Sequence, residues 1–103
     1  MAQDSEPQIS DNPSRERYEL RLGENVIGSI DYYTDESAVV LTHTDVDRTF
    51  EGRGYGSRLI SGALDDIRAR GLTVVPVCPF VRSYIGRHPE YADLVGRGHA
   101  ARG

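Results

Sequence analysis

The segment EGRGYGS, residues 51–57, decides how this 103-residue chain is organised. The hydrophobic pattern is that of strands before it and that of a helix after it. Alternating glycines let the backbone turn tightly and bring its N–H groups close to a ligand. The start of a helix adds unpaired N–H donors and a partial positive charge. The segment therefore predicts a glycine loop, residues 51–57, that can hold an anion such as a pyrophosphate.

Two familiar phosphate motifs do not fit the glycine loop. A Walker loop ends in Gly-Lys-Ser/Thr, whereas Gly56 is followed here by Ser57 and Arg58. A dinucleotide fingerprint needs a third glycine in the first helical turn, where this chain has Ser57 or Leu59. A third interpretation stays open, in which the glycines do no more than cap a helix.

The residues before the loop predict strands. Apolar and polar residues alternate over residues 18–22, 26–33 and 38–44, with a turn at 23–25 and a break at 34–37. Connections this short predict an antiparallel meander. In the third strand, simple alternation puts Leu41 and His43 on one face. Residues 1–15 are polar, contain two prolines and show no periodicity, so we expect a flexible tail there.

The residues after the loop predict one long helix, one strand and one short helix. Apolar residues recur at helical spacing from Leu59 to Ile67, and Gly71 is a stop signal. Residues 72–77 indicate a strand interrupted by Pro76, and residues 80–87 a short helix. A right-handed crossover would make that strand parallel to the one before the loop. We expect an α+β domain over residues 16–95, with a flexible C-terminus at 96–103.

Composition narrows the function classes. The formal net charge of −4 argues against broad nucleic-acid binding, which needs clustered Lys and Arg. The apolar runs are far shorter than a membrane span, and the N-terminus lacks a signal-peptide pattern. The single cysteine, Cys78, excludes an intrachain disulfide and a Cys-rich zinc site, so we expect a reducing, cytoplasmic setting and no metal.

The glycine loop resembles the coenzyme A loop of the GNAT superfamily of N-acetyltransferases. That motif reads Gln/Arg-x-x-Gly-x-Gly/Ala; Gly54 and Gly56 match it, and Glu51 departs from it. Together with the segments 42–44, 77–80 and 88–91, the loop is similar to the short, single-domain branch of that superfamily over residues 18–95. The resemblance implies a GNAT-like fold that binds acetyl-CoA as cosubstrate. Its cofactor-binding residues would be Glu51, Gly52, Arg53, Gly54, Tyr55, Gly56, Ser57 and Arg58.

The resemblance also implies that the strands before the loop and after the helix splay apart, with the pantetheine arm in the gap. A proline at position 76 suits such a break, although it is also typical of an ordinary edge strand.

Three residues are candidates for catalysis. His43 could act as a base near neutral pH, or be a structural strand histidine. Cys78 precedes a predicted helix, where a thiol ionises more readily, and related proteins of this branch carry a Cys in a comparable Cys-Pro-Phe segment. It could accept the acetyl group covalently or merely pack beside the cofactor. The resemblance implies that Tyr84 protonates the departing thiolate; alternatively, Tyr84 and Phe80 form one apolar helix face.

The sequence thus favours an N-acetyltransferase that moves an acetyl group from acetyl-CoA to an amine. The tight turn at residues 23–25 stands where larger GNAT enzymes carry helices that shape the acceptor pocket, so an open site suited to a protein or peptide amine is expected. The alternative is a non-catalytic module that binds coenzyme A or an acyl-CoA.

Overall fold

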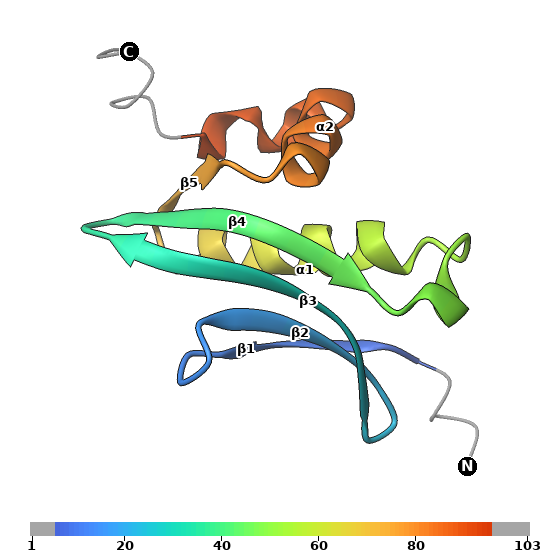
Figure 1. Ribbon diagram of the computed structural model, residues 1–103. Coiled ribbons are helices and arrows are strands. Elements are labelled where there is room, and N and C mark those ends of the chain that lie inside the picture. The colour runs from blue at the N-terminus through green and yellow to red at the C-terminus, as the bar shows by residue number, and fades with distance from the viewer. Residues whose placement is uncertain (1–5, 96–103) are drawn as a thin grey trace.

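The computed structural model describes residues 6–95 as a five-stranded sheet with one long helix across it (Figure 1). The sheet has the order β1-β2-β3-β4-β5, in which β1 to β4 are antiparallel and β5 is parallel to β4. These elements confirm the α+β class, the antiparallel meander and the parallel strand after the helix. The strands are β1 (Gln8–Asn12), β2 (Arg17–Leu22), β3 (Asn25–Asp35), β4 (Ala38–Val46) and β5 (Thr73–Pro76). The helical elements are η2 (Arg48–Phe50), α1 (Tyr55–Ala69), α2 (Pro79–Arg87) and η3 (Pro89–Leu94).

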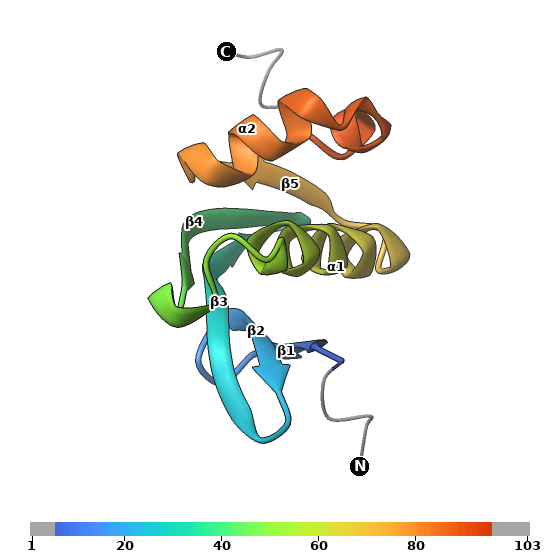
Figure 2. The same cartoon turned by 90° about the vertical axis from the view of Figure 1, so that its right-hand side faces the viewer.

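Helix α1 lies along one face of the sheet and contacts all five strands (Figure 2). Its apolar side is fully buried against strand residues that include Leu20, Ile30 and Leu41. The helix ends just before Gly71, whose φ of +72° suits the left-handed stop predicted from the sequence. Among residues 6–95, no helix is long and apolar enough to cross a membrane.

The N-terminal region corrects the expected flexible tail, because residues 8–12 form the edge strand β1. Ile9 packs on α1 at Gly62, where an added Cβ would lie 2.9 Å from Ile9 Cδ1. The hydroxyl of Tyr32 donates to Asp11 Oδ1 at 2.6 Å, and Arg70 Nη2 lies 3.0 Å from Asp11 Oδ2. These contacts come from distant parts of the chain, so the local sequence QISDN gives no signal of them. Residues 1–5 and 96–103, including the expected flexible C-terminus, lie outside the described residues.

A bulge in β4 changes which side chains face α1. Leu41 and His43 pair with consecutive residues of β3, so Thr42 has no partner in that strand. The Thr42 hydroxyl instead donates to the carbonyl oxygen of Asp31 at 3.2 Å. The extra residue reverses the alternation, so that Thr44 rather than His43 follows the face of Leu41. The prediction that His43 shares a face with Leu41 is therefore wrong, because simple alternation does not anticipate a bulge.

The pairing of β4 with β5 ends at Leu41 and Pro76. The next two backbone N–H groups, of Val77 and Cys78, both donate to the carbonyl oxygen of Leu41, at 3.1 and 2.9 Å. Beyond this point β4 continues through residues 42–46 paired with β3 only, while the chain after Pro76 turns into α2. The break that the sequence indicated at Pro76 thus coincides with the point where β4 and β5 part.

Candidate active site

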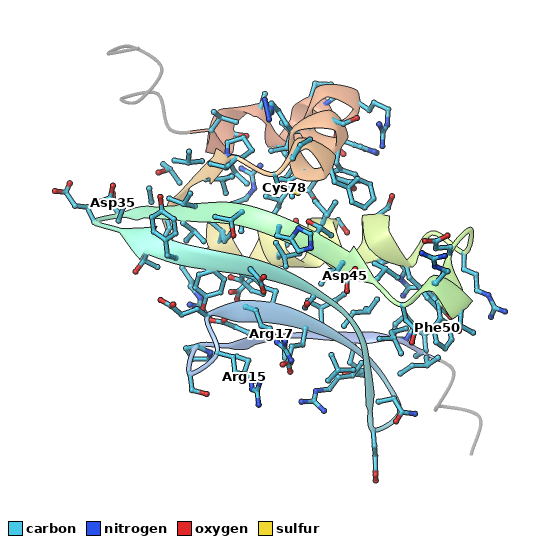
Figure 3. The ribbon with its side chains drawn as sticks, viewed as in Figure 1. Arg15, Arg17, Asp35, Asp45, Phe50 and Cys78 are labelled. Carbon is cyan, nitrogen blue, oxygen red and sulfur yellow. The ribbon has the colours of Figure 1, made fainter. Side chains whose placement is uncertain are left out.

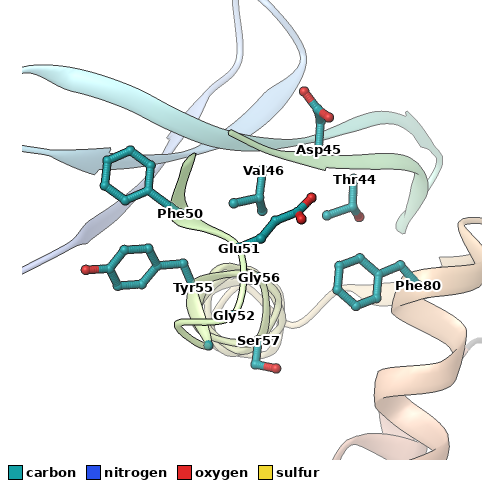
Figure 4. Close-up of a pocket in the computed structure, with 11 residues that line it drawn as sticks. Thr44, Asp45, Val46, Phe50, Glu51, Gly52, Tyr55, Gly56, Ser57 and Phe80 are labelled. Carbon is teal, nitrogen blue, oxygen red and sulfur yellow. The ribbon is translucent and has the colours of Figure 1, made fainter. Parts of the chain in front are cut away.

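A pocket with a cavity volume of about 440 Å³ lies where the end of β4, the glycine loop and the start of α2 meet (Figure 4). Aromatic rings form its walls, and the carboxylate of Glu51 reaches it, whereas the Asp45 side chain points away from the cavity on the other side of β4. It combines an apolar body with a few polar groups, as small-molecule sites commonly do. The lining residues are Thr44, Asp45, Val46, Phe50, Glu51, Gly52, Gly54, Tyr55, Gly56, Ser57 and Phe80.

The glycines of the loop are required by its backbone conformation. Gly52 has φ of +83° and Gly54 has φ of +77°, both in the left-handed region that other residues rarely adopt. Gly54 is the N-cap of α1 and makes no side-chain capping bond, so the first N–H groups of the helix face the loop without a capping side chain. At Gly56 an added Cβ would lie 3.2 Å from the Phe80 ring. The loop therefore offers backbone donors and the positive end of a helix to an anion.

The pocket brings together most, but not all, of the residues predicted to bind the cofactor. Glu51, Tyr55, Ser57 and the three glycines line it. Arg53 does not; its guanidinium carbon lies 5.7 Å from the centre of the Phe50 ring. Arg58 is also outside the lining, with its Nη2 3.4 Å from Glu6 Oε1. Two predicted phosphate-binding arginines thus lie beside the pocket rather than in it.

Cys78 lies next to the pocket, where α2 approaches β4 (Figure 3). Its side chain is buried, with the residue 4% exposed, and its Sγ lies 3.3 Å from Oγ1 of Thr44, which lines the pocket. Burial raises the pKa of the Cys78 thiol, but the Thr44 hydroxyl and the backbone amides of Val81 and Phe80 lower it by more, so the net pKa is below the ordinary value. The Cys78 thiol is therefore buried, and its lowered pKa favours the thiolate form.

The other two catalytic candidates lie elsewhere. His43 is exposed, on the side of β4 turned away from Thr44 by the bulge. Tyr84 is buried, at 6% exposure, and its ring stacks on that of His88 with the centres 4.0 Å apart. Neither residue lines the pocket, whereas the sulfur of Cys78 contacts the side chain of Thr44, which does.

Sequence reasoning missed several lining residues. Thr44, Asp45 and Val46 directly precede the loop, and the end of a strand that leads into a binding loop was the available signal for them. Phe80 belongs to the Cys-Pro-Phe segment, which the resemblance singled out for its cysteine alone. Phe50 lies in η2, a 3-10 turn that the hydrophobic pattern does not reveal.

Solved structures of acetyltransferases share this fold. The solution structure of a GCN5-like putative N-acetyltransferase from Staphylococcus aureus matches 86% of this chain and 87% of that chain, with a TM-score of 0.66 and 20% identity. The ribosomal-protein-S18-alanine N-acetyltransferase from Escherichia coli matches with a TM-score of 0.53 and 15% identity over 71% of this chain and 44% of that chain. A ribosomal-protein-alanine N-acetyltransferase from Brucella melitensis biovar Abortus 2308 matches with a TM-score of 0.52 and 20% identity, over 78% of this chain and 62% of that chain.

At sequence level, no curated protein matches this chain. A family model does: the one described as GCN5-related N-acetyl-transferase matches residues 17–94, from β2 to the end of η3. That range contains the whole pocket, together with Cys78 and the bulge in β4. The chain belongs to the GCN5-related N-acetyltransferase family.

Proposed function

We propose that this chain transfers an acetyl group from acetyl-CoA to an amine. The observation that carries the proposal is the pocket, which joins a glycine loop at the start of α1 to the end of β4 just beyond its last pairing with β5. The loop suits the pyrophosphate of coenzyme A, because it presents backbone N–H groups at the positive end of a helix. Family membership supports the same cosubstrate.

In this proposal the acetyl thioester lies near Thr44 and Cys78. The Cys78 thiolate would attack the acetyl carbonyl and form an acetyl-cysteine, which the amine then resolves. The lowered pKa of the thiol and its contact with a pocket residue support this route. If Cys78→Ala keeps its turnover, the amine attacks the thioester directly and Cys78 only packs beside the cofactor.

The acceptor we propose is a protein or peptide amine. Strands β2 and β3 are joined through Gly23 and Glu24 alone, so no helix lies between them to close over an acceptor. Two solved structures with this fold are named for the alanine of a ribosomal protein, which is an acceptor of this class. The carboxylate of Glu51 at the pocket would attract a positively charged amine.

A calorimetric titration with acetyl-CoA tests the proposal first. We expect one binding site per chain, and then acetylation of a mixed peptide library, detected by mass spectrometry. The burial of Cys78 favours a second candidate, a non-catalytic coenzyme A module. Binding without acetylation of either peptide or Cys78 would select that module, and absence of binding would overturn both.

A further inference from the structure

The Cys78 thiol reaches the pocket through one polar side chain, that of Thr44. Cys78 is buried and does not line the pocket, whereas Thr44 is half-buried and does. Their Oγ1 and Sγ atoms are 3.3 Å apart, within hydrogen-bond distance for sulfur. Cys78 is the N-cap residue of α2, and the backbone amides of Phe80 and Val81 in the first turn of that helix also act on its sulfur. The Thr44 hydroxyl is therefore the side-chain partner of the sulfur.

The backbone positions of Thr44 and Cys78 are each held by neighbouring elements. Thr44 faces the sulfur because the bulge at Thr42 reverses the alternation of β4. Cys78 is attached to the same strand, since its backbone N–H donates to the carbonyl oxygen of Leu41 at 2.9 Å. Its own carbonyl oxygen accepts from the N–H of Arg82 at 3.0 Å, which anchors it to α2. Each of the two contacting atoms is thus one rotatable bond away from a backbone that hydrogen bonds hold in place.

We propose that Thr44 is a positioning residue, whose hydroxyl holds the Cys78 sulfur towards the pocket and stabilises it as a thiolate. Either atom can donate while the thiol is protonated. Once Cys78 has lost its proton, Thr44 must be the donor, because a thiolate has no proton to give. A hydrogen bond that forms best with the charged state favours ionisation. The lowered pKa of the thiol agrees with this direction.

The inference rests on the proposed function for its chemical purpose. Cys78 gives its proton to water, and the thiolate attacks the acetyl carbonyl carbon of acetyl-CoA. A bond forms between that carbon and Sγ, the bond from the same carbon to the coenzyme A sulfur breaks, and the released thiolate takes a proton from water. Thr44 forms no covalent bond in this step. Together with the backbone amides of Phe80 and Val81, its hydroxyl raises the share of thiolate and orients the sulfur.

Three variants separate the hydroxyl from the rest of the residue. Thr44→Val keeps the branched shape and removes the hydroxyl, while Thr44→Ser keeps the hydroxyl. Thr42→Val is the matched control, because it removes a hydroxyl of the same strand that bonds to Asp31 instead of Cys78. Because Cys78 is the single cysteine, labelling cysteine Cβ with ¹³C gives one resonance, whose pH dependence reports ionisation without acetyl-CoA.

We expect the wild type, Thr44→Ser and Thr42→Val to titrate below the ordinary thiol pKa of about 8.5, and Thr44→Val to titrate at higher pH. At pH 7, acetylation of Cys78 by acetyl-CoA should fall about tenfold in Thr44→Val alone, since a tenfold change equals one pH unit of thiolate population. Equal midpoints in all four proteins would overturn the inference. A wild-type midpoint at or above the ordinary value would also overturn it, even if Thr44→Val did not fold. A shifted midpoint without acetylation of Cys78 in any protein would support the role of Thr44 and reject the acetyl-cysteine route of the proposed function.

Discussion

The two ends of α1 differ in how firmly they are bonded to the rest of the molecule. At the C-terminal end, the Tyr18 hydroxyl donates to Asp66 Oδ2 at 2.7 Å, and Arg70 contacts both Asp66 and Asp11 at 3.0 Å. The Tyr32 hydroxyl completes the network at Asp11. We call this set, Asp11, Tyr18, Tyr32, Asp66 and Arg70, the anchored end, since it ties three strands to one helix terminus.

The N-terminal end of α1 is built in the opposite way. Gly54 caps the helix without a side chain, Gly52 is also left-handed, and the pocket opens directly on the loop. The neighbouring Arg58 makes one long contact of 3.4 Å, to an exposed glutamate. One helix thus has an end consolidated by side-chain bonds and an end whose backbone donors remain available to a ligand. Binding sites are commonly taken from such less consolidated regions, carried on a firmly held scaffold.

Of the changes we predict, the largest difference between the two ends of α1 should come from replacing the left-handed glycine at each end by valine. Gly54 and Gly71 both have positive φ, of +77° and +72°, and an added Cβ at either position meets no atom within 4 Å. Valine should therefore cost each protein about 1–2 kcal/mol of unfolding free energy. Of the two, we expect only Gly54→Val to weaken acetyl-CoA binding, because it changes the backbone of the glycine loop. The loss should be about a hundredfold or more in Kd, which corresponds to about 2.7 kcal/mol of binding free energy.

Calorimetry on both variants, with urea unfolding to compare their stabilities, measures the difference. Gly71→Val controls for general strain, since its stability should fall while its affinity stays near the wild-type value. Equal losses of affinity in the two variants would mean that the loop has no special part in binding.

Removal of a carboxylate from the anchored end should affect stability and not binding. Asp66→Ala leaves the buried Tyr18 hydroxyl without its partner, and we expect the unfolding free energy to fall by about 2 kcal/mol. Asp93→Ala is the control, because its ion pair with Arg68 is largely exposed and should contribute little to stability. Urea denaturation of the two variants tests this order, and a larger loss for Asp93→Ala would contradict it.

The same comparison explains how much the sequence could predict. The helix, its stop at Gly71 and the break at Pro76 each follow from local rules, namely periodicity, a positive φ and a missing N–H group. The loop was found because glycine has a backbone requirement that shows directly in the sequence. These features depend on neighbours along the chain, which is why the sequence reveals them.

The features that the sequence did not reveal depend on neighbours across space. Strand β1 has one apolar residue, and its position depends on Gly62 and on the anchored end. The bulge at Thr42 becomes visible only when β3 and β4 are paired, and it moves His43 away from the pocket and Thr44 into it. No local pattern could therefore indicate that Thr44, rather than His43, contacts Cys78.

The smallest effect we predict concerns pH and the support of β1 by β2. The Glu19 side chain is 3% exposed, and its oxygens accept hydrogen bonds from Arg17 at 2.9 Å, Arg21 at 3.0 Å and Asn12 of β1 at 3.1 Å. Burial raises the pKa of Glu19, but these bonds lower it by more, so its pKa is lower in the folded chain than in the unfolded one. The stabilisation is then complete above the unfolded value of about 4.3 and is lost as pH falls through the folded value. Glu19→Gln should be less stable than the wild type by about 1 kcal/mol at pH 7, since its partners are partly exposed, and the difference should vanish at low pH. Urea unfolding at pH 7, 5 and 3 measures this, with the exposed Glu24→Gln as the control; a difference that stays constant with pH would show that shape, and not charge, makes Glu19 important.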